Sequence, residues 1–492
     1  MNEGIRKKLG EASFSIRGIA MGSAILVLCG AFIAGLISFF THDRAPLPKA
    51  EQELISSIYT RFLLQEAGGV WNVSQLEGPV PEGLDALFIG PEELWHPVLV
   101  AKSSLPDPDQ GVRFALGLWK RTNQQLREAL QLFHEENSSY PSSLVRALEL
   151  DTALLLGDGT LLNDLASDPE YQDEVDSMFQ FRWGLRSGDW KKMLRHFPAS
   201  QYSALERAPL LLAVLAGGIW SLLLLTFYPG RPPVRFLLTA LLALVLGAVS
   251  TWPTVLSGMW MESALGISGG TDFFSTLFAM IVSVGFREEV LKLLLFSPLL
   301  IITHRRGSDL EALLLGAFVG LGFAMEENIT YVSGNLSGVA VSRFVSANML
   351  HFMLTGATAL ALSRAVRDPK AWGLDALQVL VFAIGLHGIY NTLLSQPVPG
   401  LGDMSYFHGA ALVGCAALFF PEMERLIPSG GRTFSRTGLF CWGLCLLFGL
   451  ELILAVQYVP FRQALYLTGQ AALASVFTGY IFIHAIREPL HS

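Results

Sequence analysis

Residues 285–300 read GFREEVLKLLLFSPLL, and this stretch decides the class of fold. It belongs to an apolar run long enough to cross a bilayer, yet it carries Arg287, Glu288, Glu289 and Lys292. A charged side chain at the centre of a membrane helix costs roughly 2.5–3.5 kcal/mol, so four of them facing lipid would cost on the order of 10 kcal/mol. We therefore expect these side chains to face partners or a cavity.

The composition of the whole chain is that of a membrane protein. Of its 492 residues, 51% are hydrophobic and 15% are charged, which is not the balance of a soluble globular domain. Apolar windows of about 18 or more residues predict membrane helices. They cover residues 18–40, 208–228, 235–255, 273–303, 311–332, 341–363, 371–395, 407–422, 437–457 and 463–485. The predicted fold class is an all-α polytopic membrane protein with about ten transmembrane helices.

Basic residues predict the orientation of these helices. Residues 1–41 contain a basic stretch followed by a long apolar run without a small-residue cleavage site, so we interpret them as a cytoplasmic N-terminus and an uncleaved signal-anchor helix. Alternating the spans from there places 15 basic residues on the cytoplasmic side and two, Arg343 and Arg462, on the short outer loops. The positive-inside rule supports this arrangement.

Residues 42–207 form the one long hydrophilic segment, which this topology places outside the cytoplasm. It holds 25 acidic and 15 basic residues and so accounts for the acidity of the chain. Patterns such as REALQLF and DWKKMLRHF predict amphipathic helices. Gly157-Asp158 and Gly188-Asp189 recur at about the period of helical-hairpin repeats. We expect an α-helical extracytoplasmic domain with a repeat-like organisation.

The rest of the chain divides into three predicted parts. Residues 208–269 form a transmembrane hairpin, residues 270–396 a transmembrane core rich in polar motifs, and residues 397–492 additional C-terminal transmembrane helices. The four cysteines all fall inside predicted spans: Cys29, Cys415, Cys441 and Cys445. Their positions predict small packing residues rather than disulfides or a metal site.

The first span of the predicted core carries a possible ion pair, and the second carries a stripe of small residues. On a helix, Lys292 reaches either Glu289, three residues before it, or Glu288, four residues before it. An internal ion pair with a purely structural role is one interpretation of this set. The second span has a stripe of small residues, Gly316, Gly320 and Ala324, which permits close helix packing.

Six polar or aromatic positions continue this pattern along the core. Phe323 and Glu327 share one face of the second span, and Asn328 follows. The third span places His351 near mid-depth, and the fourth carries His387 and Asn391 four residues apart on one face. Glu, His or Asn on four consecutive spans favours a functional site over isolated structural polar residues.

These motifs together resemble those of one family of membrane enzymes. The set comprises EExxK (Glu288, Glu289, Lys292), FxxxE followed by Asn (Phe323, Glu327, Asn328), a lone histidine (His351) and HxxxN (His387, Asn391). In order and helix placement it resembles the PrsW family of intramembrane proteases, which is related to CAAX-processing glutamic proteases. The resemblance covers roughly residues 270–395.

The resemblance implies a membrane-embedded endopeptidase, and it assigns roles to the motif residues. Glu288 or Glu289 is the base that activates water, with Glu288 preferred, and Lys292 keeps one glutamate ionised. Glu327, His351 and His387 complete the water or metal site, and Asn391 stabilises the oxyanion. We expect metal-free chemistry, with Zn²⁺ as the alternative; its ligands would be drawn from Glu289, Glu327, His351 and His387.

Other assignments of these residues remain open. Gly266 to Gly269 fit the GxSG of rhomboid serine proteases, and Gly400 to Asp403 fit the GxGD of presenilin-like proteases, but both lie in predicted loops. A proton-coupled transporter also places acids and histidines inside a helix bundle, and a non-catalytic scaffold could retain the same polar core. Glu451, alone in the ninth span, fits none of these roles.

The expected partners follow from the resemblance. The substrate is a membrane protein or peptide cut in or near the lipid bilayer, with the first cut of an anti-sigma factor in envelope-stress signalling as the pathway hypothesis. The expected location is the plasma (inner) membrane of a bacterium, and no nucleic-acid partner is expected. The sequence does not determine the oligomeric state.

Overall fold

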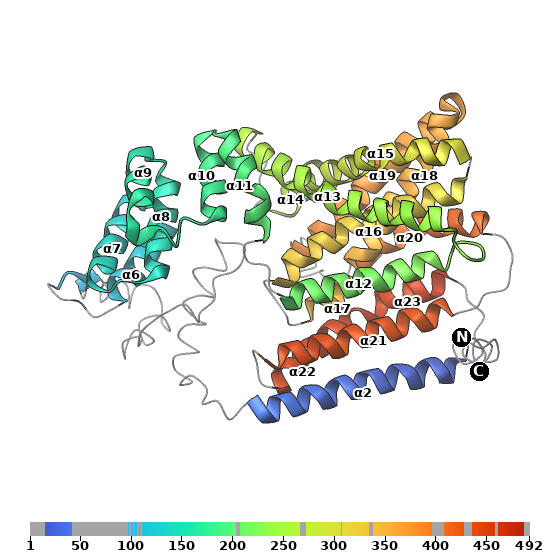
Figure 1. Cartoon of the computed structure of the whole chain (residues 1–492), viewed down its shortest axis with the longest axis horizontal. Helices are drawn as coiled ribbons and strands as arrows, with labels where there is room; N and C mark the ends of the chain where they lie inside the picture. Colours follow the sequence, from blue (N-terminus) through green and yellow to red (C-terminus); the bar gives the residue numbers. More distant parts are fainter. Residues whose placement is uncertain are drawn as a thin grey trace. The chain divides into compact units, whose positions relative to one another are not determined.

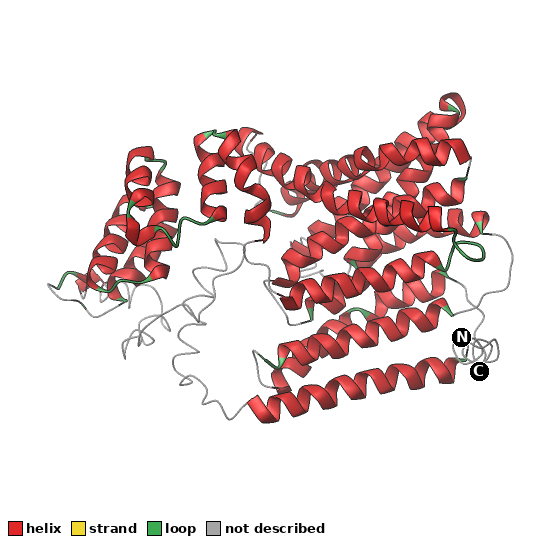
Figure 2. Cartoon of the chain, viewed as in Figure 1, coloured by secondary structure: helices red, strands yellow, loops and turns green. Residues whose placement is uncertain are grey.

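The computed structural model describes residues 15–41, 111–202, 207–265, 272–306, 308–333, 338–395, 408–427, 435–457 and 461–486, and a few residues between 97 and 108. Helices make up almost all of this described part, which contains no strand (Figure 2). The chain separates into two compact units, one formed by residues 1–41 and 206–492 and the other by residues 42–205.

The first unit is a bundle of long apolar helices that run side by side (Figure 1). They are α2 (Ile16–Thr41), α12 (Arg207–Leu225), α13 (Val234–Leu265), α14 (Phe273–Ala279), η3 (Met280–Gly285), α15 (Phe286–Arg306), α16 (Asp309–Ser333), α17 (Val339–Val345), α18 (Ala347–Arg367), α19 (Pro369–Ser395), α20 (His408–Leu426), α21 (Arg436–Ala455), α22 (Phe461–Ala474) and α23 (Val476–Ala485). Each of the ten predicted spans coincides with one of these helices or with a broken helix.

Not every one of these helices is long and apolar enough to cross a membrane. Six described segments meet that condition: α2, α13, α16, α17 with α18, α19 and α21. The bent pair α22 and α23 makes a seventh if it is one span. The all-helical membrane class is confirmed, and the count of ten spans stays a prediction.

The centre of this unit is the pair α16 and α18, whose facing residues are almost all buried. The predicted small-residue stripe explains how closely they pack. A Cβ atom on Gly320 would collide with the backbone carbonyl of His351, and one on Gly316 would collide with Ala359. Close approach through small residues is how membrane helices gain packing contacts. The glycines therefore set the position of His351 relative to α16.

The described part of the second unit contains three pairs of successive helices. They are α6 (Val112–Thr122) with α7 (Leu126–Ser139), α8 (Ser143–Leu156) with α9 (Gly159–Ser167), and α10 (Ser177–Ser187) with α11 (Trp190–Tyr202). Gly157 and Gly188 end α8 and α10 in the left-handed conformation, and the carboxylates of Asp158 and Asp189 cap the helices that follow. The repeated Gly-Asp pairs are thus the turns of two successive hairpins.

Candidate active site

The two glutamates of the opening stretch follow directly on an irregular turn. The π-helical segment η3 separates α14 from α15 and ends at Gly285. A π turn adds one residue to the helical turn, so it rotates everything after it, and such turns occur often at functional sites. Gly285 lies against the backbone of Ile384 on α19, and Gly388 lies against Ile281. This close approach of η3 and α19 brings His387 on α19 beside Glu288 and Glu289.

Glu289 is held from two sides. Its Oε1 accepts a hydrogen bond from Lys292 Nζ at 2.6 Å and lies 2.8 Å from His387 Nδ1. All three side chains are buried. Because the carboxylate can only accept, His387 carries its proton on Nδ1 and leaves Nε2 as the basic nitrogen. Glu289 therefore orients His387 and neutralises Lys292.

Lys292 also fixes the second histidine. Its Nζ lies 2.9 Å from His351 Nδ1, and His351 Nε2 lies 3.1 Å from Glu327 Oε2. The ammonium group can only donate, so the neutral His351 ring accepts at Nδ1 and donates from Nε2. The two histidines consequently have opposite tautomers, and only His387 presents a basic nitrogen to the cluster.

Glu288 differs from its neighbour Glu289 in its surroundings. It is 6% exposed, and its Oε2 lies 3.5 Å from His387 Nε2 and 4.0 Å from Lys292 Nζ. Among the described residues, no donor makes a hydrogen bond to that oxygen. A buried acceptor without a donor is costly and rare outside functional sites. Glu289 Oε2 also lacks a donor among the described residues, but Glu289 is fully buried, so Glu288 Oε2 is the atom of the cluster best placed to bind an external group.

Glu327 is the most open carboxylate of the cluster. Its side chain is 24% exposed, and its Oε2 accepts from Arg343 Nη2 at 2.6 Å as well as from His351. Arg343 also donates from Nε to the side-chain oxygen of Asn328, and Asn328 donates to Asn348 at 2.7 Å. Arg343 comes from α17, so a fifth helical segment contributes to the site.

Aromatic and imidazole rings close the cluster. The Phe323 ring lies under Lys292 Nζ, 4.5 Å from its centroid, and 5.0 Å from the His351 ring. The rings of His351 and His387 are 5.1 Å apart. A cation over an aromatic face gains electrostatic energy that grows with desolvation. This contact gives the phenylalanine of the FxxxE motif a physical role.

The structure brings six of the seven predicted site residues together: Glu288, Glu289, Lys292, Glu327, His351 and His387. Asn391 lies one turn from His387 on α19 and is partly exposed. In the described part of the chain its side chain makes no hydrogen bond or ion pair with the cluster. Sequence reasoning missed Arg343 and Asn348, because the break between α17 and α18 at Ser346 changes which residues share a face.

The donor set also fits a metal ion. Glu288, His351 and His387 each offer a ligand atom, and these atoms lie within 4.8 Å of one another. Three such ligands are typical of catalytic zinc, and a histidine ligand usually donates its other N–H to a carboxylate, as His387 does to Glu289. His351 would need to release Lys292 or Glu327. This set differs from the expected one, since Glu289 and Glu327 are engaged by other partners.

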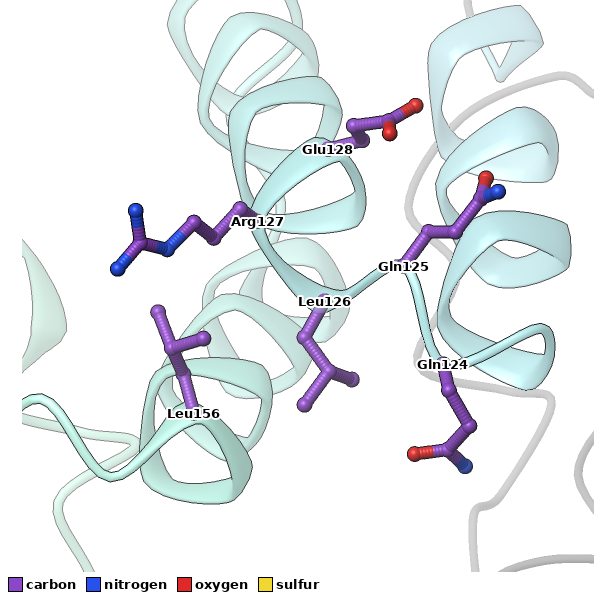
Figure 3. Close-up of a pocket in the computed structure, with 6 residues that line it drawn as sticks. All are labelled: Gln124, Gln125, Leu126, Arg127, Glu128 and Leu156. Carbon is purple, nitrogen blue, oxygen red and sulfur yellow. The ribbon is translucent and has the colours of Figure 1, made fainter.

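An open pocket of about 250 Å³ lies elsewhere, at the turn between α6 and α7 (Figure 3). Its lining comprises Gln124, Gln125, Leu126, Arg127, Glu128 and Leu156. These residues include no histidine or cysteine and only one carboxylate, which is not a set for acid–base or metal chemistry. The GxSG and GxGD motifs lie outside the described residues. The buried cluster is therefore the candidate active site.

Comparison with known families agrees with this placement. Residues 232–420 match the model of the PrsW family intramembrane metalloprotease. Over these residues the chain is similar to the PrsW family. All seven predicted site residues fall within the match, and the resemblance inferred from their motifs is confirmed. Comparison with curated proteins and with solved structures gives no match. The family supports a peptidase that acts in a membrane on membrane-protein substrates.

Proposed function

We propose that the chain is an intramembrane endopeptidase in which Glu288 activates the attacking water. The observation that carries the proposal is the buried Glu288 Oε2, to which no described residue donates a hydrogen bond and which lies 3.5 Å from the basic Nε2 of His387. A general base must have a free acceptor within reach of the proton that it takes. Glu289 Oε2 also lacks a donor among the described residues, but Glu289 is fully buried and Lys292 and His387 hold its Oε1, so we assign water activation to the more accessible Glu288.

In the proposed reaction Glu288 transfers the proton, and other residues of the cluster hold the reacting groups in place. Glu288 accepts a proton from water as the water oxygen bonds to the scissile carbonyl carbon, and then gives that proton to the leaving amine. Lys292 and Glu289 fix both histidines, and Asn391 is proposed as an oxyanion donor once substrate is bound. If zinc binds at Glu288, His351 and His387, it would lower the pKa of the bound water, and Glu327 is then the remaining base.

The depth of the cluster supports cleavage within the bilayer. Glu327 lies six residues before the end of α16 at Ser333, about 9 Å along the helix axis. Glu288 lies 15 residues after the start of α14 at Phe273 and 18 residues before the end of α15 at Arg306, about 22 Å and 27 Å along this broken helix. The predicted topology places the end of α16 and the start of α14 on the outer side. We therefore propose substrates cut between the middle and the outer surface of a bacterial plasma membrane.

The pathway proposal rests on the family resemblance. We propose that the substrate is a membrane-anchored anti-sigma factor and that this cut is the first step of envelope-stress signalling. The test compares N-termini of membrane proteins, by mass spectrometry, in cells with the wild type and with Glu288→Gln at equal expression. New termini only in the wild type support proteolysis and identify the substrate. Identical profiles under several envelope stresses would favour a transporter or a scaffold instead.

The metal question has its own measurement. Zinc is quantified in purified protein for the wild type, His387→Ala and Glu327→Gln. Stoichiometric zinc that is lost in His387→Ala and kept in Glu327→Gln supports the ligand set Glu288, His351 and His387. Absence of zinc from a preparation that cleaves substrate in the presence of a chelator would support metal-free chemistry.

A further inference from the structure

A seven-residue helix supplies the arginine that pairs with Glu327 in the candidate catalytic cluster. This helix, α17, is broken from α18 at Ser346 and carries Arg343, whose guanidinium pairs with Glu327 at 2.6 Å. Glu327 in turn bonds His351. A helix this short has unsatisfied N–H groups at one end and C=O groups at the other, and it is unstable by itself. Its position must therefore be set by neighbours.

The N-terminal end of α17 is held by a carboxylate from another helix. Glu451 on α21 is fully buried, and its Oε1 accepts from the backbone N–H of Gly338 at 2.9 Å and of Ala340 at 3.1 Å. Its Oε2 accepts from the N–H of Val341 at 3.0 Å. Both oxygens are satisfied, and the charge sits at the positive end of the helix. Glu451 thus caps α17 across a helix interface.

The C-terminal end of α17 is held by a tryptophan. Trp220 on α12 donates from Nε1 to the backbone carbonyl of Phe344 at 2.8 Å, and its ring packs on the Phe344 ring with centroids 5.3 Å apart. Trp220 is 1% exposed. Its ring also contacts Phe352 on α18, which binds α17 to the helix that carries His351. Both ends of the short helix therefore make hydrogen bonds with other helices.

We infer that Glu451 and Trp220 are positioning residues for the catalytic cluster, which act by holding Arg343 on Glu327. Both residues lie outside the matched segment 232–420, on α21 and α12. Helices beyond the matched segment then contribute to the site, because they hold the short helix that carries Arg343. The catalytic meaning of this inference rests on the proposed function, but the positioning itself can be measured without catalysis.

The first experiment measures the state of Glu327 by reaction with dicyclohexylcarbodiimide, an apolar reagent for protonated carboxyl groups in membranes. The full-length protein in lipid nanodiscs is labelled, and modification of Glu327 is quantified by mass spectrometry. We expect Glu451→Gln and Trp220→Phe each to raise labelling of Glu327 at least threefold, as Arg343→Ala does. Neither change should raise labelling further in the Arg343→Ala background. Unchanged labelling, or additive effects in that background, would overturn the inference.

A matched control separates this effect from a general loss of packing. Trp442 on α21 donates its indole N–H to the backbone carbonyl of Ile19 at 3.2 Å, so Trp442→Phe removes the same kind of bond away from α17. It should leave Glu327 labelling at the wild-type level. Hydrogen exchange of the amides of residues 338–345 should accelerate in Glu451→Gln and Trp220→Phe but not in Trp442→Phe. Trp220→Phe retains an aromatic side chain while removing the N–H donor, and it serves if Glu451→Gln does not fold.

Cleavage assays distinguish this inference from the proposed function. On the substrate identified from new N-termini, Glu451→Gln and Trp220→Phe should lower kcat about tenfold with little change in KM, and the loss should disappear in the Arg343→Ala background. A wild type that cleaves nothing, with the labelling pattern intact, would contradict the proposed function and leave the positioning in place. Wild-type kcat in both variants would contradict the catalytic role of the positioning.

Discussion

Glu288 and Glu451 are both buried glutamates in membrane helices, and their surroundings differ in one respect. Glu451 accepts three backbone hydrogen bonds that satisfy both of its oxygens. Glu288 lies among Lys292, His387 and Arg287, and one of its oxygens lacks a hydrogen-bond donor in the described structure. A fully satisfied buried carboxylate stabilises a fold, while an unsatisfied one beside a basic nitrogen can react. The same residue type thus serves structure in one helix and chemistry in another.

The strongest test of this comparison is the stability of alanine and glutamine variants. Glu451→Ala leaves three buried N–H groups without acceptors, each costing about 1–3 kcal/mol, so we expect a loss on the order of 5 kcal/mol. Glu288→Gln removes a poorly satisfied charge and should leave the unfolding free energy unchanged or higher. Unfolding of both variants in mixed micelles gives the two values. Equal losses would remove the distinction between the two glutamates.

Cleavage activity should depend more on Glu288 than on Glu451, which is the reverse of the order expected for stability. Removing a general base typically lowers the rate about 10²–10⁴-fold, so Glu288→Gln should abolish measurable cleavage although it folds normally. The intact fold is checked by its unfolding curve. A Glu288→Gln enzyme with near wild-type kcat would transfer the base role to another carboxylate of the cluster.

Glu288 belongs to a cluster with a buried cation, Lys292, whereas Glu451 accepts from backbone N–H groups. Lys292→Met leaves the carboxylate of Glu289 buried with only His387 as a partner, and breaking a buried ion pair costs about 3–5 kcal/mol. The double variant Glu289→Gln/Lys292→Met removes both charges and should recover most of that loss. Thermal unfolding of the single and double variants measures the coupling. A double variant less stable than Lys292→Met would show that the ion pair is not what holds these helices together.

A smaller effect is expected from the glycine that brings α16 against α18. Gly320→Ala places a methyl group against the backbone carbonyl of His351, and overpacking of this kind costs about 1–3 kcal/mol. Because His351 moves with its backbone, kcat should fall with the stability. Gly218→Ala is the control, since a Cβ atom there meets open space and alanine favours the helix. If the two variants behave alike, close packing at Gly320 does not set the site.

The smallest effect concerns a third buried glutamate, in the helical-hairpin unit. Glu136 caps the start of α6 by accepting from the N–H of Gly111 at 2.6 Å, much as Glu451 caps α17. Burial raises the pKa of Glu136 above its ordinary value, although this hydrogen bond opposes the shift. A folded-state pKa above the unfolded one stabilises the fold below the unfolded pKa, and this contribution is lost as pH rises through the folded pKa.

Hydrogen exchange of α6 and α7 in the full-length protein measures this dependence between pH 4 and 7. After correction for intrinsic exchange rates, the wild type should lose protection relative to Glu136→Gln as the pH increases. Parallel curves for the two proteins would mean that ionisation of Glu136 does not affect the hairpin unit.

The two capping glutamates show where sequence reasoning ends. Hydropathy predicted helix at all ten spans, because an apolar run and its helical period are local properties of the chain. The recurrence of Gly157-Asp158 and Gly188-Asp189 indicated helical hairpins, and the structure adds that each pair forms a turn with a left-handed glycine and a capping aspartate. Glu451 has no partner of this kind in its own helix, so its role could not be predicted.

The sequence by itself determined that this chain is a helical membrane protein with acids, a lysine and histidines on four successive helices, because charges in apolar runs require partners. Only the tertiary structure decided which atoms pair. In the structure Lys292 forms its hydrogen bond with Glu289 rather than with Glu288, and Arg343 forms one with Glu327. The hydrogen bonds of the two histidines define their tautomers. Pairing depends on the π turn of η3, on close packing at Gly320 and on the break at Ser346. These features arise from contacts between helices distant in sequence, which no local pattern contains.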